Sequence, residues 1–119
     1  MEKVKFEEKF SLFNDYWSPK IVGELNGQLV KFAKFKNEFV WHKHDDEDEM
    51  FFVLKGTLII EFRDKKVELQ ANEFIIVPRG TEHKPVAAEE VWVMLFEPKT
   101  TLNTGDTEGE LTKRELDIL

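Results

Sequence analysis

The chain has 119 residues but no cysteine, and its 24 acidic residues outnumber its 17 basic ones. The absence of cysteine excludes disulfides, thiolate metal sites and a cysteine nucleophile. The formal net charge of −7 argues against nucleic acid and against anionic membrane surfaces, because both require a basic face. No apolar run is long enough to span a membrane, and the N-terminus lacks the apolar segment of a signal peptide. We therefore expect a cytoplasmic protein that binds neither nucleic acid nor a membrane.

The rest of the composition favours one globular domain with an aromatic core. A chain of this length can bury a core without disulfides or structural zinc. Eleven phenylalanines and three tryptophans are available to fill that core. We divide the chain into an N-terminal capping or helical segment over residues 1–18, a β-barrel over residues 19–98 and a C-terminal tail over residues 99–119.

Short apolar runs separated by turn signals dominate the central part of the chain. Asn26-Gly27 lies between two such runs and predicts a type I′ hairpin, since both residues tolerate a positive φ. In the run from Leu58 to Phe62, the even-numbered residues are apolar and are expected to point inward. About nine short strands are expected, among them residues 39–42, 83–86 and 91–96. This pattern predicts an all-β sandwich or barrel.

The two ends of the chain depart from the β pattern. Phe6, Phe10 and Phe13 recur at helical spacing, which predicts a short helix or capping turn over residues 3–13 that covers an open end of the core. The tail beyond Pro98 is polar and is expected to be either an extended arm or partly disordered. An alternative is a short terminal helix that docks on a partner, formed by Leu111, Leu116, Ile118 and Leu119.

All three histidines fall where a single metal site needs them. Side chains two apart on a strand share a face, so His42 and His44 point the same way. The acidic turn after them lets the chain reverse and returns Glu49 beside His44. His83 enters from a separate strand after the stiff corner at 78–80. Imidazole and carboxylate groups are common ligands of divalent metals, so these four residues are candidate ligands.

Each part of this pattern has a simpler interpretation when taken alone. A pair of histidines on a strand is often a surface pair, and a single histidine after a turn is more often structural than a ligand. The acidic run over residues 45–48 is usually only a solvated loop. The combination of all the parts at one site is what favours a metal.

The combined pattern resembles the cupin superfamily over residues 30–97. The first motif of that superfamily is G(X)5HXH(X)3,4E(X)6G, and its second motif is G(X)5PXG(X)2H(X)3N. The first motif is matched by His42, His44, Glu49 and Gly56, and the second by Pro78, Gly80 and His83. The chain departs from the motifs at turn and scaffold positions, namely Lys36, Asn72 and Ala87.

The resemblance implies a small jelly-roll barrel with a divalent metal ion near one mouth. It also implies the ligand set His42, His44, Glu49 and His83, and a homodimer formed through edge strands, for which the N-terminal segment and exposed aromatic side chains are available. The ligand types do not choose among Fe, Mn, Ni, Zn, Co and Cu.

Two functions remain open at this stage. One is a metal-dependent enzyme, a dioxygenase or a sugar or keto-acid isomerase, that acts on a small polar organic molecule bound in the barrel. Single-domain cupins of this kind are often described as mannose-6-phosphate isomerase-like. The other is a non-catalytic module that binds a metal or a small ligand, because fold alone does not determine function.

The sequence identifies no general acid or base clearly. The weak candidates are Tyr16, Glu24 and Glu97. Strand parity suggests pocket-lining roles for some aromatic and sulfur side chains, although the same parity suits plain core residues better. These side chains are Phe52, Trp92, Met94 and Phe96.

Overall fold

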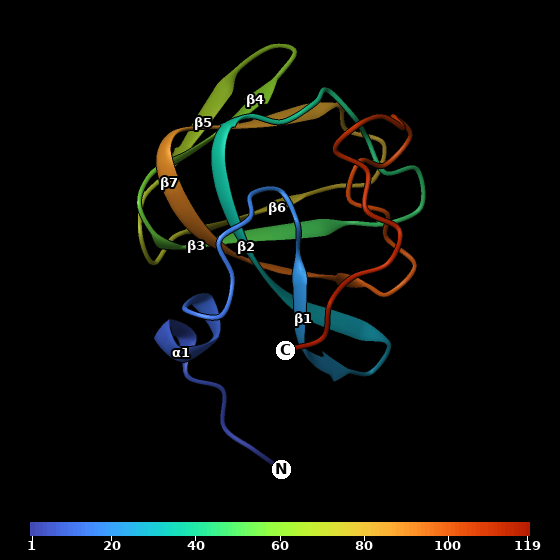
Figure 1. Cartoon of the computed structure of the whole chain (residues 1–119). Coiled ribbons are helices and arrows are strands. Elements are labelled where there is room, and N and C mark those ends of the chain that lie inside the picture. Colours follow the sequence, from blue (N-terminus) through green and yellow to red (C-terminus); the bar gives the residue numbers. More distant parts are fainter.

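The computed structural model describes all 119 residues and shows seven antiparallel strands curled into a barrel, with one short helix (Figure 1). The all-β jelly-roll with a short N-terminal helical segment is thereby confirmed. None of its helical structure has the length and apolar character needed to cross a bilayer. The elements are α1 (Phe6–Phe10), β1 (Lys20–Leu25), β2 (Gln28–Glu38), β3 (Glu49–Lys55), β4 (Leu58–Phe62), β5 (Lys66–Leu69), β6 (Phe74–Val77) and β7 (His83–Pro98).

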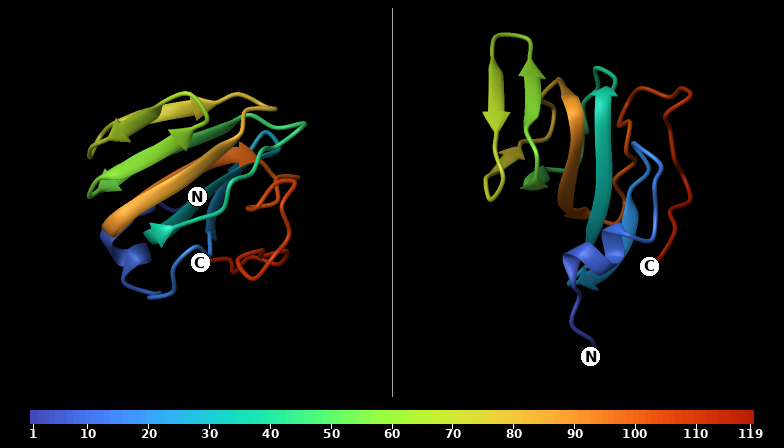
Figure 2. Two further views of the ribbon diagram at one scale, coloured as in Figure 1. Left: turned by 90° about the horizontal axis from the view of Figure 1, so that it is seen from above. Right: turned by 60° about the vertical axis from the view of Figure 1, so that its left-hand side comes forward.

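The long strand β7 connects the parts of the barrel. Its first residues pair with β4, its last residues pair with β3, and β2 runs along its other edge (Figure 2). The change of partner coincides with a register shift, where Phe35 pairs with Val91 but Asn37 pairs with Ala87. We expected two strands here, over residues 83–86 and 91–96. The structure joins them into one, because the irregularity bends the strand without ending its pairing with β2.

Two glycine turns fix the register of neighbouring strands. Asn26 and Gly27 have φ angles of 51° and 79°, as a type I′ turn requires, and they join β1 to β2 as predicted. Gly56 has a φ of 92° and joins β3 to β4. A Cβ atom added at Gly56 would lie 2.8 Å from the Cγ2 atom of Val91 and 2.9 Å from the carbonyl oxygen of Glu90. Only glycine therefore fits this close approach to β7.

The two faces of the barrel wall carry different residues. Alternate side chains such as Ala33 and Phe35 of β2 and Val53 of β3 point inward and join a buried core of 13 residues. Leu58 and Ile60 of β4 belong to the same core, as their alternation predicted. The inner core therefore follows the two-residue period of the strands.

The N-terminal phenylalanines cover a different surface from the one predicted. Phe10 is fully buried and stacks on Phe32, with ring centroids 4.8 Å apart, and on Trp92, with ring centroids 4.5 Å apart. Phe32 and Trp92 lie on the outer face of β2 and β7, so α1 covers the outside of the sheet and not an open end of the core. The helix prediction was right in type, but the helix itself spans only five residues.

The C-terminal tail is an extended arm that packs along the barrel (red in Figure 1). The predicted terminal helix is wrong. Ile118 forms a parallel bridge with Ile21, and the amide of Leu119 donates to the carbonyl of Ile21 at 2.9 Å. Leu111 packs against the inner core, and Leu119 packs against the outer cluster beside α1. Leu111 and Leu119 therefore cover the chain's own barrel without a helix, whereas the side chain of Ile118 is 79% exposed.

Candidate metal centre

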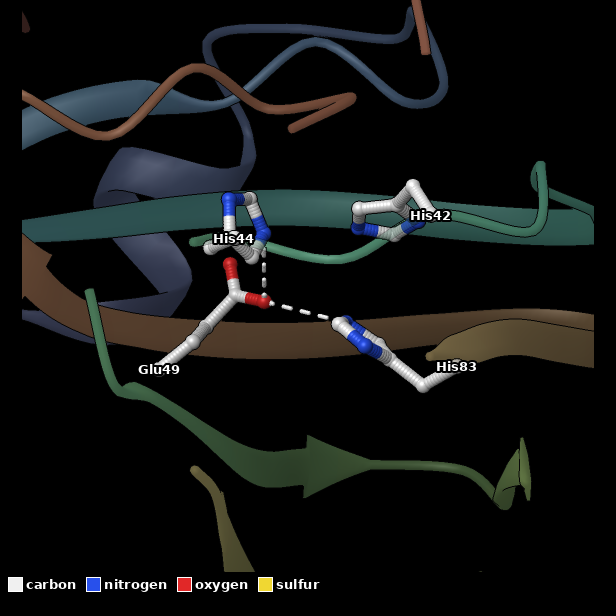
Figure 3. A group of neighbouring side chains, drawn as sticks. All are labelled: His42, His44, Glu49 and His83. Carbon is white, nitrogen blue, oxygen red and sulfur yellow. Dashed lines mark ion pairs between the residues drawn. The ribbon is translucent and has the colours of Figure 1, made fainter. Parts of the chain in front are cut away.

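Four side chains meet in one buried cluster inside the barrel (Figure 3). His42 and His44 lie on the loop between β2 and β3, Glu49 is the first residue of β3, and His83 is the first residue of β7. One candidate ligand atom from each residue lies within 4.8 Å of the other three. Ligand atoms bound about 2 Å from one ion lie about 3–4 Å apart, so small rotations bring this cluster to metal-binding geometry.

The backbone that holds the histidine pair differs from the prediction. Residues 39–42 do not form a strand, because β2 ends at Glu38. His42 instead forms one isolated bridge with His83, in which the amide of His42 donates to the His83 carbonyl at 3.1 Å and the reverse bond is 2.9 Å. This bridge is enough to bring the His42 and His83 rings together, with centroids 4.3 Å apart.

Two of the imidazoles are oriented by backbone carbonyl groups. The Nδ1 atom of His42 lies 2.8 Å from the carbonyl oxygen of Val40, and that of His83 lies 2.9 Å from the carbonyl oxygen of Thr81. A carbonyl oxygen only accepts, so both Nδ1 atoms must carry the proton. The Nε2 atoms of His42 and His83 are therefore unprotonated in the neutral rings and have lone pairs for a metal. This arrangement is typical of metal-binding histidines.

Several polar atoms at the centre of the cluster have no hydrogen-bond partner although they are buried. They are Nδ1 and Nε2 of His44, Oε1 of Glu49 and Nε2 of His83. The Glu49 Oε1 atom lies 3.3 Å from His44 Nε2 and 3.4 Å from His83 Nε2 (dashed lines in Figure 3). Buried polar groups without partners are costly, and a divalent cation would satisfy Oε1 of Glu49, Nε2 of His83 and one nitrogen of His44 at once. The donor set therefore fits a metal ion.

The electrostatics of the cluster suit a cation. Burial, assisted by the nearby His83, lowers the pKa of His42 to about 4, so its ring is neutral at pH 7. Burial alone would lower the pKa of His44, but its close contact and charge interaction with Glu49 outweigh burial and raise it. Burial alone would raise the pKa of Glu49, yet the adjacent Glu97 carboxyl group and the His44 and His83 rings hold it well below the usual range. The cluster thus keeps a carboxylate and at least one neutral imidazole at neutral pH.

Glu97 is the only one of the three predicted acid or base candidates that reaches the cluster. It is buried beside Glu49, because Met50 of β3 pairs with Phe96 of β7, and burial together with the Glu49 charge raises the pKa of Glu97 well above its usual value. Tyr16 lies at the surface, where its hydroxyl donates to Glu90 at 2.8 Å. Glu24 is also exposed, and it pairs with Lys99 at 3.6 Å. These two candidates were therefore wrong as residues of this site.

The loop that carries His42 and His44 is held from two sides. The amide of Gly80 donates to the carbonyl of His44 at 2.7 Å, so the predicted corner at 78–80 supports this loop as well as His83. On the other side, the amide of Asp106 donates to the carbonyl of Lys43 at 3.0 Å, and the amide of Lys43 donates to the Asp106 carboxylate at 3.0 Å. The support from the C-terminal arm was not predicted, and the turn-forming residues 103–106 were its only sequence signal.

A narrow pocket of mainly apolar character lies beside the cluster. His42 and Glu49 contribute to its wall, and Asn103 of the C-terminal arm contributes a polar group. The remaining lining residues are Trp17, Pro19, Phe35, Phe39, Phe51, Pro85 and Leu95. The predicted lining residues Phe52, Trp92, Met94 and Phe96 are absent from this wall, because they occupy the alternate, outward positions of β3 and β7. The predicted parity was wrong by one residue.

Comparisons with known proteins place these observations in a family. A family model described as a cupin domain matches residues 28–97. The crystal structure of a cupin-2 domain containing protein from Shewanella frigidimarina is 50% identical, with a TM-score of 0.80, and the match covers 81% of this chain and 94% of that one. Protein NMB1881 from Neisseria meningitidis has the same fold, with a TM-score of 0.75, 22% identity and coverage of 82% and 100%.

A relative from Bacillus subtilis, the uncharacterized protein YdbB, is 44% identical over 64 residues. That match covers 53% of this chain and 57% of YdbB, so the chain matches little more than half the length of this relative. The matched family model spans β2 to β7 and includes all four residues of the buried cluster. The chain belongs to the cupin domain family.

Proposed function

We propose that the protein is a metal-dependent enzyme that binds one divalent ion through His42, His44, Glu49 and His83. The observation that carries this proposal is the group of buried, unpartnered nitrogen and oxygen atoms facing one another inside the barrel. A bound divalent ion supplies Lewis acidity toward a carbonyl oxygen or water, or redox chemistry if the ion is iron. Around an ion that takes five or six ligands, three imidazoles and one carboxylate also leave coordination positions for a substrate.

The pocket beside the cluster favours a small substrate without a phosphate group. None of its lining residues is a lysine or arginine, so nothing in the wall neutralises a phosphate. Two candidate metal ligands, His42 and Glu49, and the side chain of Asn103 supply polar groups to its wall. These features favour a compact acid, ketone or diol whose polar head reaches the metal, as in a dioxygenase or keto-acid isomerase reaction. They give no support to a mannose-6-phosphate isomerase.

The alternative is a binding module without catalysis. The observation in its favour is the lack of an accessible acid or base, since Glu97 is buried behind Glu49 and does not line the pocket. A metal centre that only holds a ligand needs no such group. The two functions therefore share the metal site and differ in turnover.

The test begins with metal-free protein reconstituted anaerobically with Fe(II), Mn(II), Co(II), Ni(II) or Zn(II). Oxygen uptake and product formation are then followed with small keto acids, hydroxy acids and diols, alongside mannose 6-phosphate. The enzyme proposal expects turnover of an unphosphorylated compound with at least one metal, abolished in His44→Ala. Tight metal binding with ligand binding but no turnover would support the binding module instead.

We also propose that the protein forms a homodimer through the outer face of β3 and β6. β6 lies at one end of the sheet and has a free edge. Phe74 and Ile76 on this strand are 55% and 56% exposed, and Phe74 stacks on Phe52 at 6.2 Å. An exposed apolar edge of this kind usually needs a partner.

The dimer is tested by light scattering coupled to size-exclusion chromatography. The double variant Phe74→Glu/Ile76→Lys is expected to be monomeric, because charges are placed in the contact. Glu68→Lys on the exposed face of β5 is the control and should leave the mass unchanged. A monomeric wild-type protein at micromolar concentration would contradict the proposal.

A further inference from the structure

A buried lysine and a buried glutamate form a hydrogen-bonded pair behind the metal cluster and have no part in the ligand set. Lys31 and Glu97 are each only 1% exposed, and the Nζ atom of Lys31 donates to Oε1 of Glu97 at 2.8 Å. Charged groups are seldom placed so deeply inside a small barrel, because an apolar pair of similar size is often at least as stable. The position of this pair therefore calls for an explanation beyond stability.

The pair continues directly into the cluster. Glu97 is the cross-strand neighbour of Glu49, because Met50 of β3 pairs with Phe96 of β7 and both carboxyl groups are buried inside the barrel. Glu49 in turn contacts His44 at 3.3 Å and His83 at 3.4 Å. β2 supplies Lys31, β7 supplies Glu97 and β3 supplies Glu49, and these three strands are neighbours in the sheet. The paired strands of the barrel wall thus place Lys31 and Glu97 next to the Glu49 carboxylate.

We propose that Lys31 and Glu97 are positioning residues that hold the Glu49 carboxylate in the orientation that a bound metal ion requires. Glu49 is the only carboxylate among the four candidate ligands, and its Oε1 atom has no hydrogen-bond partner. His42 and His83 are oriented by backbone carbonyl groups, whereas the side chain beside Glu49 on the neighbouring strand is Glu97, which Lys31 holds in place. Groups that orient ligands in this way commonly determine metal affinity.

Glu97 acts through Glu49 and not on a substrate. The pocket beside the cluster is lined by Glu49 but not by Glu97 or Lys31. A substrate in that pocket therefore meets Glu49 and the metal ion first, and Glu97 lies behind them. Lys31 keeps Glu97 from rotating away, because leaving its own ammonium group unpaired at this depth is costly.

The inference rests on the metal site proposed above, and the experiment separates the two. Metal affinity is measured by competition with a chromophoric chelator, and the visible absorption spectrum of the Co(II)-loaded protein reports the coordination. Thermal unfolding of the metal-free protein is measured in parallel. The central variant is Lys31→Met/Glu97→Met, which replaces the pair with apolar side chains of similar volume and leaves no unpaired charge.

The double variant is expected to unfold near the wild-type temperature without metal, yet to bind metal about 10–100-fold more weakly, with an altered Co(II) spectrum. Glu97→Gln retains a donor for Glu49 and an acceptor for Lys31, so its affinity should stay within about threefold of wild type. Glu97→Asp is too short to reach both partners and should resemble the double variant, which keeps the test available if the double variant does not fold.

Lys34→Met is the matched control. Lys34 is a buried lysine on the same strand, but it faces outward and donates to the Phe13 carbonyl at 2.8 Å. This variant should change stability and not metal affinity. Wild-type affinity in the double variant and in Glu97→Asp, or loss of affinity in Glu97→Gln equal to theirs, would overturn the positioning role alone. A wild-type protein that binds no metal overturns both proposals, and metal binding without turnover overturns only the enzyme.

Discussion

The candidate metal centre has one regular side and one irregular side. Glu49 and His83 begin long strands whose register is fixed by pairing on the barrel wall. His42 and His44 lie on a loop that is held by the bridge to His83, by Gly80 and by the C-terminal arm. The wall and the loop therefore determine different properties of the protein. We expect changes in the wall core to reduce stability and changes in the loop or its supports to reduce metal affinity.

The largest effect on metal affinity is expected from His44→Ala. Removing one imidazole from the cluster should weaken metal binding by at least about 100-fold, more than losing a group that only orients a ligand. The far-ultraviolet circular dichroism should remain that of a β protein, because the loop adds no strand. Lys43→Ala is the control, since its side chain pairs with Asp45 outside the cluster. Equal affinities in the two variants would remove the basis for the ligand set.

The opposite behaviour is expected from Ile60→Ala in the wall. Ile60 is fully buried in the inner core, so the lost side chain should reduce the free energy of unfolding by about 2–5 kcal/mol, measured with urea on metal-free protein. The folded variant should bind metal as tightly as wild type. Ile59→Ala, on the alternate face of the same strand, should cost less. A large loss of metal affinity in folded Ile60→Ala would erase the distinction between wall and loop.

The support that the C-terminal arm gives to the histidine loop can be tested by substituting Gly105. A Cβ atom added at Gly105 would lie 2.2 Å from the Lys43 carbonyl oxygen, and the φ of 55° adds strain. Gly105→Ala should therefore displace the loop and weaken metal binding by about tenfold. A Cβ atom at Gly109 meets nothing within 4 Å, so Gly109→Ala is the matched control for chelator competition. If both variants bind metal like wild type, the arm does not position the loop.

A smaller effect is expected from Asp106→Ala. This change removes the side-chain acceptor of the Lys43 amide, while the main-chain bond from Asp106 to the Lys43 carbonyl remains. Metal affinity should fall by about threefold, because one hydrogen bond exposed to water contributes little. Asp64→Ala in the turn between β4 and β5 provides the control. An effect as large as that of Gly105→Ala would mean that the side chain matters more than the close backbone contact.

The sequence was most informative where a strand alternates strictly or a turn has few solutions. Asn26-Gly27 identified its hairpin, and Leu58 and Ile60 identified the inner face of β4, because local sterics and a single buried face determine both. The spacing of the four cluster residues was sufficient to predict that they meet. The two histidines need not lie on a paired strand for this prediction to hold. Alternate side chains of any short extended segment point to the same side.

The sequence was least informative where packing between distant segments decides the structure. Strands β3 and β7 are apolar on both faces, so parity alone did not reveal that Phe52 and Trp92 point outward. The place of α1 on the outer face depends on that parity, and it was predicted wrongly for the same reason. The contact of Gly105 with Lys43 joins segments far apart in the chain, and no local pattern encodes it.

The central claim is that the buried cluster holds one divalent metal ion. The most direct measurement is elemental analysis by mass spectrometry of protein purified without a histidine tag, followed by titration of the metal-free protein. The account predicts about one equivalent of a divalent transition metal per chain, bound again on titration and lost in His44→Ala. Protein that carries no stoichiometric metal and takes up none of the six candidate ions would contradict it.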